Sequence, residues 1–237
     1  VVCPKSVCRT WQKEWEVCFS HPRSFGFCLL DEGSTAERRF KLVNIGCKSQ
    51  AWPVICAINY EVLHELQDAI NTYNPDLLIL DEAHRVKSEK AQVTKAAIVA
   101  ADRADKVLLL SGTPMGNGLV GDLWSQLRML GTQIMPETYW DFVSRYAKTE
   151  SLQVGARSVN KIIGLQDPAG LAQRLEPIWY RCTKELVLDL PPKQYETVEL
   201  DLPIDVANLY KSVERDGESV LGKPLSLVTS RVVDIRL

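Results

Sequence analysis

The sequence predicts an α/β fold: a parallel sheet covered by helices on both faces, followed by a mostly helical extension at the C-terminal end. Strand-like and helix-like segments alternate through the first half of the 237 residues. The strand-like segments are short apolar runs without a polar face, as expected for parallel strands that are buried on both sides. Two of these runs end in polar residues, Asp81-Glu82 and Ser111-Gly112-Thr113-Pro114.

The first helix is predicted by apolar residues that recur every fourth position. Val7, Trp11 and Trp15 share this spacing, and Ser6 precedes them as the expected N-cap. Apolar residues over 25–30 then predict a strand. The spacing of the two tryptophans favours a role in packing over a role in base stacking, because it puts both on one helical face.

The rest of the first half repeats this alternation. Asn74-Pro75 ends one helical pattern directly before the strand that carries Asp81. We expect strands over 54–58, 77–80 and 106–110, a helix over 62–70, and an exposed, Ala- and Lys-rich helix over 88–101.

The second half has a different character. Apolar residues at helical spacing recur over 123–130, and again over 139–146 after Pro136, which suits a first helical turn. The polar stretch 149–166 has no clear period and is predicted to be a loop. A strand is expected over 196–202 and a final helix over 206–213.

We therefore place a domain boundary near Gly131, with an α/β lobe over 1–131 and a helical extension over 132–237. The chain is 46% hydrophobic and 24% charged, which is a globular composition. The net charge of −2 gives no global basic field, although a local basic face remains open. Neither a membrane span nor a signal-peptide pattern is visible.

The cysteines do not form a metal-binding pattern. The seven cysteines include no Cys-x-x-Cys pair, and only three histidines are present, so a zinc site is not expected. Cys28 and Cys56 lie in apolar strand-like runs. We interpret them as free, buried thiols of a protein in a reducing compartment.

The two carboxylates after the third predicted apolar strand suit nucleotide hydrolysis. Mg²⁺ prefers few carboxylates together with water and phosphate oxygens. One acid, Asp81, can hold the metal while its neighbour Glu82 orients and deprotonates the attacking water. An Asp-Glu pair also arises by chance at the start of a loop, so its context decides the interpretation.

That context is an ordered set of segments. Asp81-Glu82-Ala83-His84 forms a DEAH box, and Ser111-Gly112-Thr113-Pro114 follows one helix and one strand later. The other members of the set are Val2-Cys3-Pro4-Lys5-Ser6-Val7 with Trp11 and Glu14-Trp15, Val54-Ile55-Cys56-Ala57-Ile58-Asn59-Tyr60-Glu61, Leu123-Trp124-Ser125-Gln126-Leu127, Arg181-Cys182-Thr183-Lys184-Glu185-Leu186-Val187 and Leu190-Pro191-Pro192-Lys193. In this order, the segments resemble superfamily-two helicases, and more narrowly the Swi/Snf-type DNA translocases.

The resemblance implies a RecA-like lobe and a role for each matching residue. Asp81 would hold Mg²⁺ through water, and Glu82 would activate the hydrolytic water. His84 and Ser111, Gly112, Thr113 and Pro114 would couple the nucleotide state to DNA contacts. The phosphates of the tracked strand would lie near Pro4, Lys5, Ser6, Asn59 and Tyr60. Contacts of this kind position duplex DNA without reading its sequence.

Three features depart from the family pattern. Asn59 stands where the family usually has Thr, and Cys182 stands where a second Arg is usual. The phosphate-binding pattern Gly-x-x-x-x-Gly-Lys-Ser/Thr does not occur. Its nearest match, Gly217 to Pro224, is rejected because Pro224 replaces the hydroxyl residue and no buried strand precedes it.

The sequence therefore predicts a fragment of a DNA-dependent ATPase that translocates on duplex DNA by opening and closing two lobes. ATP and Mg²⁺ would act in the full parent, with little or no hydrolysis and no tight binding of either by this chain alone. Protein partners are expected to bind the helical extension. The protein is expected inside the cell, in the nucleus of a eukaryote or in the cytoplasm for a bacterial or phage protein. The alternative is a non-catalytic DNA- or partner-binding module derived from such an ATPase.

Overall fold

The structure is a computed structural model of the 237-residue chain. It describes residues 1–19, 26–48, 53–115, 119–131, 135, 138–154, 157–183, 187–189, 204 and 206–207. The chain divides into two compact units, Val1–Tyr180 and Arg181–Leu237. All the helices and strands described below belong to the first unit.

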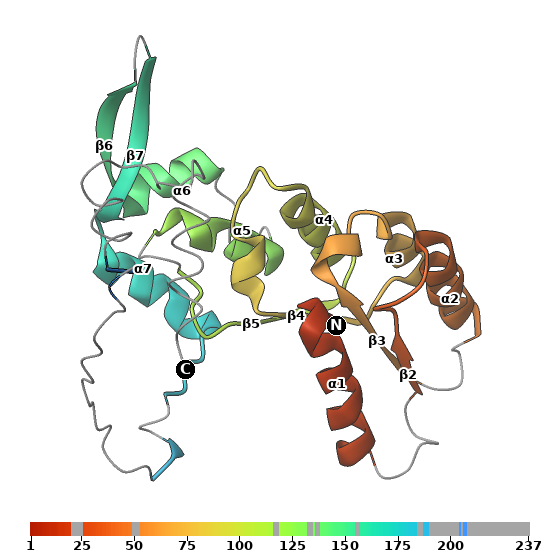
Figure 1. Ribbon diagram of the computed structural model, residues 1–237. Helices are drawn as coiled ribbons and strands as arrows, with labels where there is room; N and C mark the ends of the chain where they lie inside the picture. The colour runs from red at the N-terminus through yellow and green to blue at the C-terminus, as the bar shows by residue number, and fades with distance from the viewer. Residues whose placement is uncertain are drawn as a thin grey trace. The chain divides into compact units, whose positions relative to one another are not determined.

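A five-stranded parallel sheet organises the first unit (Figure 1). Its strand order is β2-β3-β1-β4-β5, and each neighbouring pair is parallel. The strands are β1 (Val2–Cys3), β2 (Gly26–Leu29), β3 (Val54–Asn59), β4 (Leu77–Asp81) and β5 (Lys106–Leu110). This confirms the predicted parallel sheet, and the predicted bounds of β5 are those observed.

The register of the strands brings their carboxyl ends to one edge of the sheet. Cys3 pairs with Asn59 across β1 and β3, and Asp81 pairs with Leu110 across β4 and β5. The chain segments that follow these four residues therefore leave the sheet side by side. Ligands of open α/β sheets bind at such an edge.

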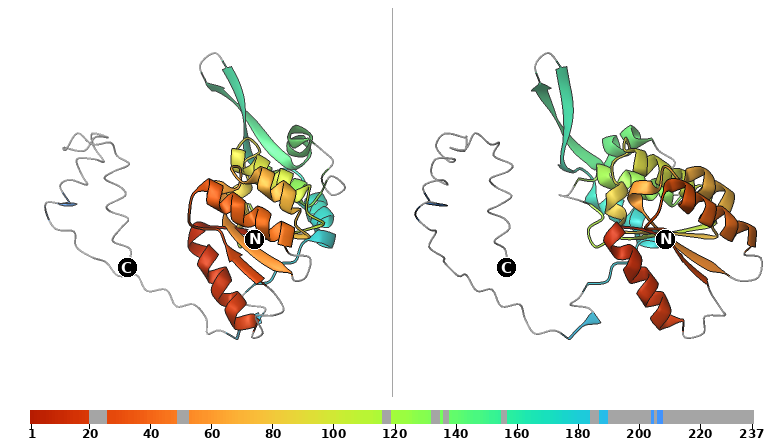
Figure 2. Two further views of the ribbon diagram at one scale, coloured as in Figure 1. Left: turned by 90° about the vertical axis from the view of Figure 1, so that its right-hand side faces the viewer. Right: turned by 45° about the vertical axis from the view of Figure 1, so that its right-hand side comes forward.

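Helices cover both faces of the sheet, as predicted. Figures 1 and 2 show α1 (Lys5–Cys18) on one face and α2 (Thr35–Lys48), α3 (Gln67–Tyr73) and α4 (Gln92–Ala101) on the other. Two short 3₁₀ helices, η1 (Tyr60–Val62) and η2 (Ala83–Val86), follow β3 and β4 directly.

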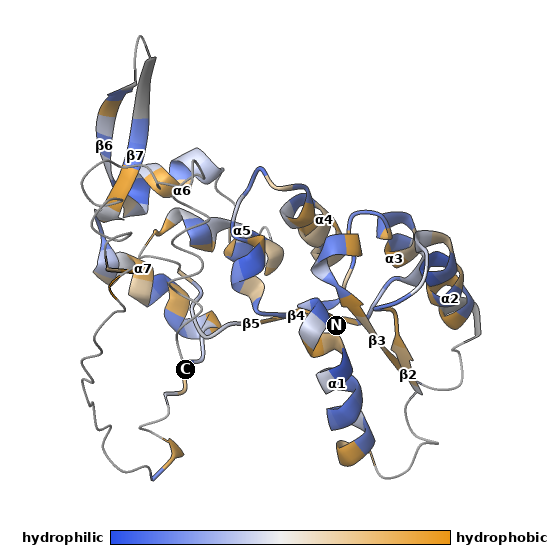
Figure 3. Cartoon of the chain, in the orientation of Figure 1, coloured by the Kyte–Doolittle hydropathy of each residue, from blue (hydrophilic) through white to orange (hydrophobic). Residues whose placement is uncertain are grey.

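The main hydrophobic core lies between the sheet and helices α2, α3 and α4. Leu78 and Leu80 of β4 and Ile58 of β3 meet the buried alanines of α4 there. In Figure 3 the strands β2 and β3 are coloured as hydrophobic, while most of α1 is hydrophilic. The apolar runs in the sequence therefore mark strands, but burial on both faces is incomplete: Leu77 of β4 is 49% exposed and Leu108 of β5 is 46% exposed.

A second hydrophobic cluster holds the segments after β5 together. It joins α5 (Gly121–Met129), α6 (Tyr139–Tyr146), α7 (Pro168–Leu175) and the 3₁₀ helix η4 (Glu176–Ile178). The predicted apolar faces of the first two helices supply its buried residues Leu123, Leu127, Phe142, Val143 and Tyr146. The predicted boundary near Gly131 stays a prediction, and Val120, which precedes it, already belongs to this cluster.

The predicted loop over 149–166 is wrong. The chain forms an antiparallel hairpin there, β6 (Ala147–Val154) paired with β7 (Arg157–Leu165), which extends away from α6 and α7 in Figure 1. Pairs such as Glu150 opposite Lys161 are polar, so no apolar face marks the strands in the sequence. Pairing between the strands, which a single-strand pattern does not reveal, defines this element.

Several predicted helix ends also differ from those observed. Helix α1 begins at Lys5 after Pro4, so Ser6 lies inside the helix and is not its N-cap. Helix α4 begins at Gln92, four residues after the predicted start at Ser88. Its alanine face is buried, whereas the sequence predicted an exposed helix. Small alanines permit close helix–sheet packing, which explains that burial.

The other corrections concern α3 and α6. Over 62–70 the chain forms a 3₁₀ helix and turns before α3 begins at Gln67. The hydroxyl of Thr138 caps α6 by accepting from the amide of Asp141, so the helix begins after Pro136 and not around it. Pro136 itself, the predicted strand over 196–202, most of the predicted helix over 206–213, and Gly217 to Pro224 lie outside the described residues. Among the described residues, none of the helices is both long and apolar enough to span a membrane.

Candidate functional site

The chain turns sharply at the end of β4. Asp81 is the last residue of the strand, and Glu82 adopts the left-handed conformation with φ 55° and ψ 50°. The carbonyl of Glu82 then accepts from the amide of Arg85 at 2.9 Å, which closes the first turn of η2. The two neighbouring carboxylates thus leave the sheet in different directions.

Asp81 is held by two residues from other elements. The indole Nε1 of Trp11, on α1, donates to Asp81 Oδ2 at 2.9 Å. The hydroxyl of Tyr60, on η1, donates to the backbone carbonyl of Asp81 at 2.8 Å. Both donors come from the segments that the sequence places near DNA.

Glu82 faces the segment after β5 through a histidine. The Nδ1 atom of His84 lies 3.2 Å from Glu82 Oε2 and 3.2 Å from Ser111 Oγ. A proton on Nδ1 can therefore be donated to either oxygen. The structure thus brings together three residues predicted from the DEAH box and the Ser-Gly-Thr-Pro segment.

The Ser-Gly-Thr-Pro segment is itself anchored to α5. The amide of Thr113 donates to Ser111 Oγ at 3.2 Å, and Gln126 Nε2 of α5 donates to the carbonyl of Pro114 at 2.7 Å. A side chain at Gly112 would meet no atom within 4 Å, so this position faces open space. The segment thus connects the carboxylate site to α5.

The predicted DNA residues lie at the ends of β1 and β3. Lys5 and Ser6 are exposed in the first turn of α1, while Pro4 is buried beneath them. The first turn of α1 contains no acidic residue. Unpaired amides and the helix dipole make such a terminus favourable for an anion.

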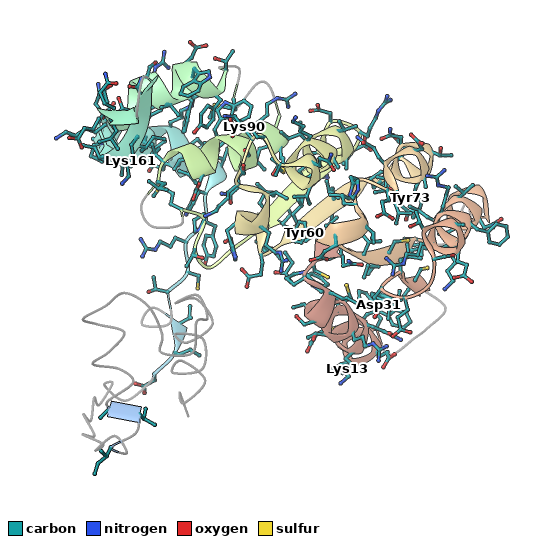
Figure 4. The ribbon with its side chains drawn as sticks, turned by 45° about the horizontal axis from the view of Figure 1, so that its top comes forward. Lys13, Asp31, Tyr60, Tyr73, Lys90 and Lys161 are labelled. Atoms are coloured by element: carbon teal, nitrogen blue, oxygen red, sulfur yellow. The ribbon has the colours of Figure 1, made fainter. Side chains whose placement is uncertain are left out.

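Asn59 and Tyr60 are placed differently from Lys5 and Ser6. Asn59 is 3% exposed and Tyr60 2% exposed, so both side chains face protein groups. Figure 4 shows Tyr60 within the body of the first unit. Burial raises the pKa of the Tyr60 hydroxyl, which keeps it protonated as the donor to Asp81.

Three residues of this edge were missed in the sequence. Trp11 and Glu61 were included in the segments expected near DNA and Arg85 in the run after the DEAH box, but none of the three was given a role of its own beyond the packing of Trp11. Arg85 Nη2 donates to Glu61 Oε1 at 3.0 Å, and Asn59 Nδ2 donates to Glu61 Oε2 at 2.7 Å. The only local signal was their position, directly after Tyr60 and His84 in the two motifs.

The acidic residues fit one side of a magnesium–phosphate site. Asp81 Oδ2 is oriented by Trp11. Among the described residues, no group of three or more His, Cys, Asp or Glu side chains forms a metal cage. The neighbouring carboxylates of Asp81 and Glu82 suit Mg²⁺, which keeps several waters and takes its other ligands from nucleotide phosphates.

An apolar cavity of about 330 Å³ lies elsewhere, at the amino ends of the strands. Its lining includes Pro53, Val54, Pro75 and Leu77. The lining is mostly apolar, and its polar side chains include Trp11, Tyr73 and Asp76, whose carboxylate would repel nucleotide phosphates, so the carboxyl edge of the sheet is the better candidate site.

Comparison with known proteins identifies the family. The family model of the SNF2-related domain matches residues 1–232. The DNA annealing helicase and endonuclease ZRANB3 of Bos taurus is 30% identical over 171 residues, which cover 72% of this chain and 16% of that protein. The TATA-binding protein-associated factor mot1 of Aspergillus fumigatus is 30% identical over 203 residues, covering 81% of this chain and 10% of that protein.

A solved structure has the same fold. It is the Sulfolobus solfataricus SWI2/SNF2 ATPase core in complex with dsDNA, with a TM-score of 0.55 and 21% sequence identity. The match covers 90% of this chain and 42% of that chain. This chain thus spans only a small part of its curated relatives and less than half of the solved core, and it belongs to the SNF2-related domain family.

Proposed function

We propose that this chain is the metal-and-water part of the first lobe of a DNA-dependent ATPase that translocates on duplex DNA. The observation that carries the proposal is the direct hydrogen bond from Trp11 to Asp81. It joins the helix that presents Lys5 and Ser6 to the carboxylate pair after β4. Family membership supports the same function, because the model of the SNF2-related domain matches residues 1–232.

In the proposed reaction, Glu82 is the general base. Its carboxylate, 46% exposed, orients a water molecule and accepts its proton as the water attacks the terminal phosphate. Asp81, fixed by Trp11 and Tyr60, would hold Mg²⁺ through water. Bound Mg²⁺ supplies positive charge that offsets the charge on the phosphate oxygens.

His84 and the Ser111–Pro114 segment are the proposed coupling elements. His84 contacts both Glu82 and Ser111, so a movement or charge change of the Glu82 carboxylate alters the contact with Ser111 after β5. Gln126 carries that change to α5 through the carbonyl of Pro114.

The DNA contacts are proposed at the carboxyl ends of β1 and β3. The Lys5 ammonium and the first-turn amides of α1 would bind backbone phosphates of duplex DNA, and Asn59 and Tyr60 would support that surface from beneath. Phosphate contacts position DNA and carry no sequence information. In a eukaryotic source, we propose a nuclear location, with protein partners at the helical extension.

Complete turnover needs groups that no motif of these 237 residues supplies. A phosphate-binding loop and the arginines of a second lobe would come from the rest of the parent protein. We therefore propose that the isolated chain hydrolyses little or no ATP. Robust DNA-stimulated turnover by this chain, abolished by Glu82→Gln, would overturn that part of the proposal.

Lys5 provides the test of the DNA-binding part. We expect the isolated chain to bind fluorescently labelled duplex DNA, with an affinity that falls as salt rises. Lys5→Ala should weaken binding similarly on different sequences and reduce the slope of log affinity against log salt by about one. Fluorescence anisotropy at several salt concentrations measures both quantities.

Lys13→Ala is the matched control, because Lys13 is exposed on the same helix near its other end (Figure 4). It should leave the affinity and the salt slope unchanged. Equal losses in the two variants, or no loss with Lys5→Ala, would contradict the placement of DNA at the start of α1.

A further inference from the structure

Glu61 lies between the two halves of the site and contacts both. Its Oε2 accepts from Asn59 Nδ2 at 2.7 Å, and its Oε1 accepts from Arg85 Nη2 at 3.0 Å. Asn59 ends β3, on the side where DNA is proposed to bind. Arg85 belongs to η2, the turn that begins directly after Asp81 and Glu82.

A second set of contacts runs beside the first. The guanidinium carbon of Arg85 lies 5.8 Å from the centroid of the Tyr60 ring, within the range of a cation–π contact. The hydroxyl of the same tyrosine donates to the carbonyl of Asp81. The Asn59-Tyr60-Glu61 segment is therefore joined to the Asp81–Arg85 segment at three points.

The register of β1 and β3 ties this contact to the surface proposed for DNA, because Cys3, two residues before Lys5, pairs with Asn59. Hydrogen bonding from Asn59 lowers the pKa of Glu61, and the positive charges of Arg85 and Lys5 lower it further. Glu61 is therefore ionised at neutral pH and pairs with Arg85 as an anion.

The hydrogen bonding of the Asn59 side chain also links Glu61 to the surface proposed for DNA. Its Oδ1 is buried and has no hydrogen-bond partner within the described part of the chain. Its amide orientation is therefore held through the nitrogen by Glu61, because nothing described holds the oxygen. A change at Glu61 would release a buried amide next to the DNA surface.

We propose that Glu61 and Arg85 are positioning residues that transmit DNA binding at the start of α1 to the Asp81–Glu82 turn. The inference rests on the proposed function. Cys3, two residues before Lys5, pairs with Asn59 in the sheet, so a phosphate bound at the start of α1 acts on the end of β3. Glu61 links that strand end to Arg85, which lies in the turn that orients Glu82. Neither residue needs to touch DNA or nucleotide to act in this way.

Amide hydrogen exchange of the isolated chain tests this transmission. Mass spectrometry would follow peptides covering residues 1–10 and 81–87, with and without saturating duplex DNA. We expect DNA to slow exchange in the first peptide and to change exchange in the second by about fivefold, the lower end of typical coupling between sites. Glu61→Gln and Arg85→Gln should keep the response of the first peptide and abolish that of the second.

Arg128→Gln is the matched control. Arg128 on α5 makes a bidentate ion pair with Asp102, with N–O distances of 2.9 and 3.1 Å, and it contacts neither Glu61 nor Arg85 through this pair. It should leave both responses as they are in the unmodified chain. Thermal unfolding of each variant without DNA checks the fold. Should Glu61→Gln fail to fold, Arg85→Gln tests the same link from the other side.

The outcomes separate the two proposals. DNA protection at residues 1–10 without any change at 81–87 overturns the transmission and leaves the DNA surface intact. An unchanged response at 81–87 in both folded variants also overturns it. Absence of DNA protection at residues 1–10 in the unmodified chain contradicts the proposed function, and the inference that rests on it falls as well.

Discussion

Glu82 combines a reactive carboxylate with a costly backbone conformation. Its φ of 55° lies in the left-handed region, where a side chain crowds the backbone. Strain of this kind costs on the order of 1 kcal/mol or more and gathers at functional sites. Here the conformation turns the chain out of β4 so that Asp81 and Glu82 point to different partners.

We expect Glu82→Gly to stabilise the fold while removing the proposed general base. Glycine adopts positive φ without steric cost, so the free energy of unfolding should rise by about 1 kcal/mol. Urea unfolding followed by circular dichroism measures the change. Asn74→Gly is the control, because Asn74 also has positive φ but asparagine tolerates it, so that variant should change stability less. A clear decrease in the free energy of unfolding of Glu82→Gly would contradict the claim that the backbone of Glu82 is strained.

Trp11 shows how one residue can serve two purposes. The sequence assigned it to packing, because its spacing with Val7 and Trp15 marks a helical face. The structure places its indole nitrogen 2.9 Å from Asp81 Oδ2. Helical spacing identifies the face of a residue, but it does not identify a hydrogen-bond partner 70 residues away in the sequence.

At the scale of elements, β2 and β3 bring two cysteines together. Cys28 and Cys56 are direct partners in the parallel register, and both are free thiols and partly buried. This confirms their placement in strands as free thiols, although neither is fully buried. A hydrogen bond from Cys56, together with the nearby positive charge of Lys41, lowers the pKa of Cys28 to about 7.

The lowered pKa predicts selective alkylation of Cys28. The thiolate is the reactive form, so the rate of reaction with iodoacetamide should rise as the pH passes through about 7. Cys56→Ala removes the hydrogen-bond donor and should slow the reaction at pH 7 by about fivefold, after allowing for the greater nucleophilicity of a more basic thiolate. Peptide mass spectrometry resolves the sites. Equal rates at Cys28 in the two proteins would contradict the assigned cause.

The β6–β7 hairpin shows where sequence patterns fail for a whole element. A half-buried strand is recognised by alternating apolar residues. Much of this hairpin is exposed, with polar pairs such as Glu150 and Lys161, and Ile162 packs against the second cluster. The hairpin is therefore defined by cross-strand hydrogen bonds, for which the local sequence gave no periodic signal.

At the scale of the molecule, the first unit contains two hydrophobic clusters of different origin. One lies between the sheet and its helices, and the other joins α5, α6, α7 and the base of the hairpin. Helix α5 links them, because Met129 belongs to the first cluster while Leu123 and Leu127 belong to the second. A division at Gly131 would therefore separate α5 from its partners.

Two truncated chains test this organisation. A fragment of residues 1–180 keeps both clusters and should unfold cooperatively when heated, as followed by circular dichroism. A fragment of residues 1–131 exposes the apolar face of α5 and should bind a hydrophobic dye more strongly. Cooperative unfolding of the shorter fragment without dye binding would instead support an independent lobe ending near Gly131.

The sequence by itself determined the parallel sheet, the helices on its two faces, the carboxylate pair after β4 and the order of motifs that marks the family. Each of these features depends on a short stretch of sequence, because buried strands need apolar runs and reactive residues follow the carboxyl ends of the strands. Only the tertiary structure decided the bond from Trp11 to Asp81, the contacts of Glu61 with Asn59 and Arg85, and the hairpin. These depend on strand register and packing between distant segments, and local periodicity carries no information about either.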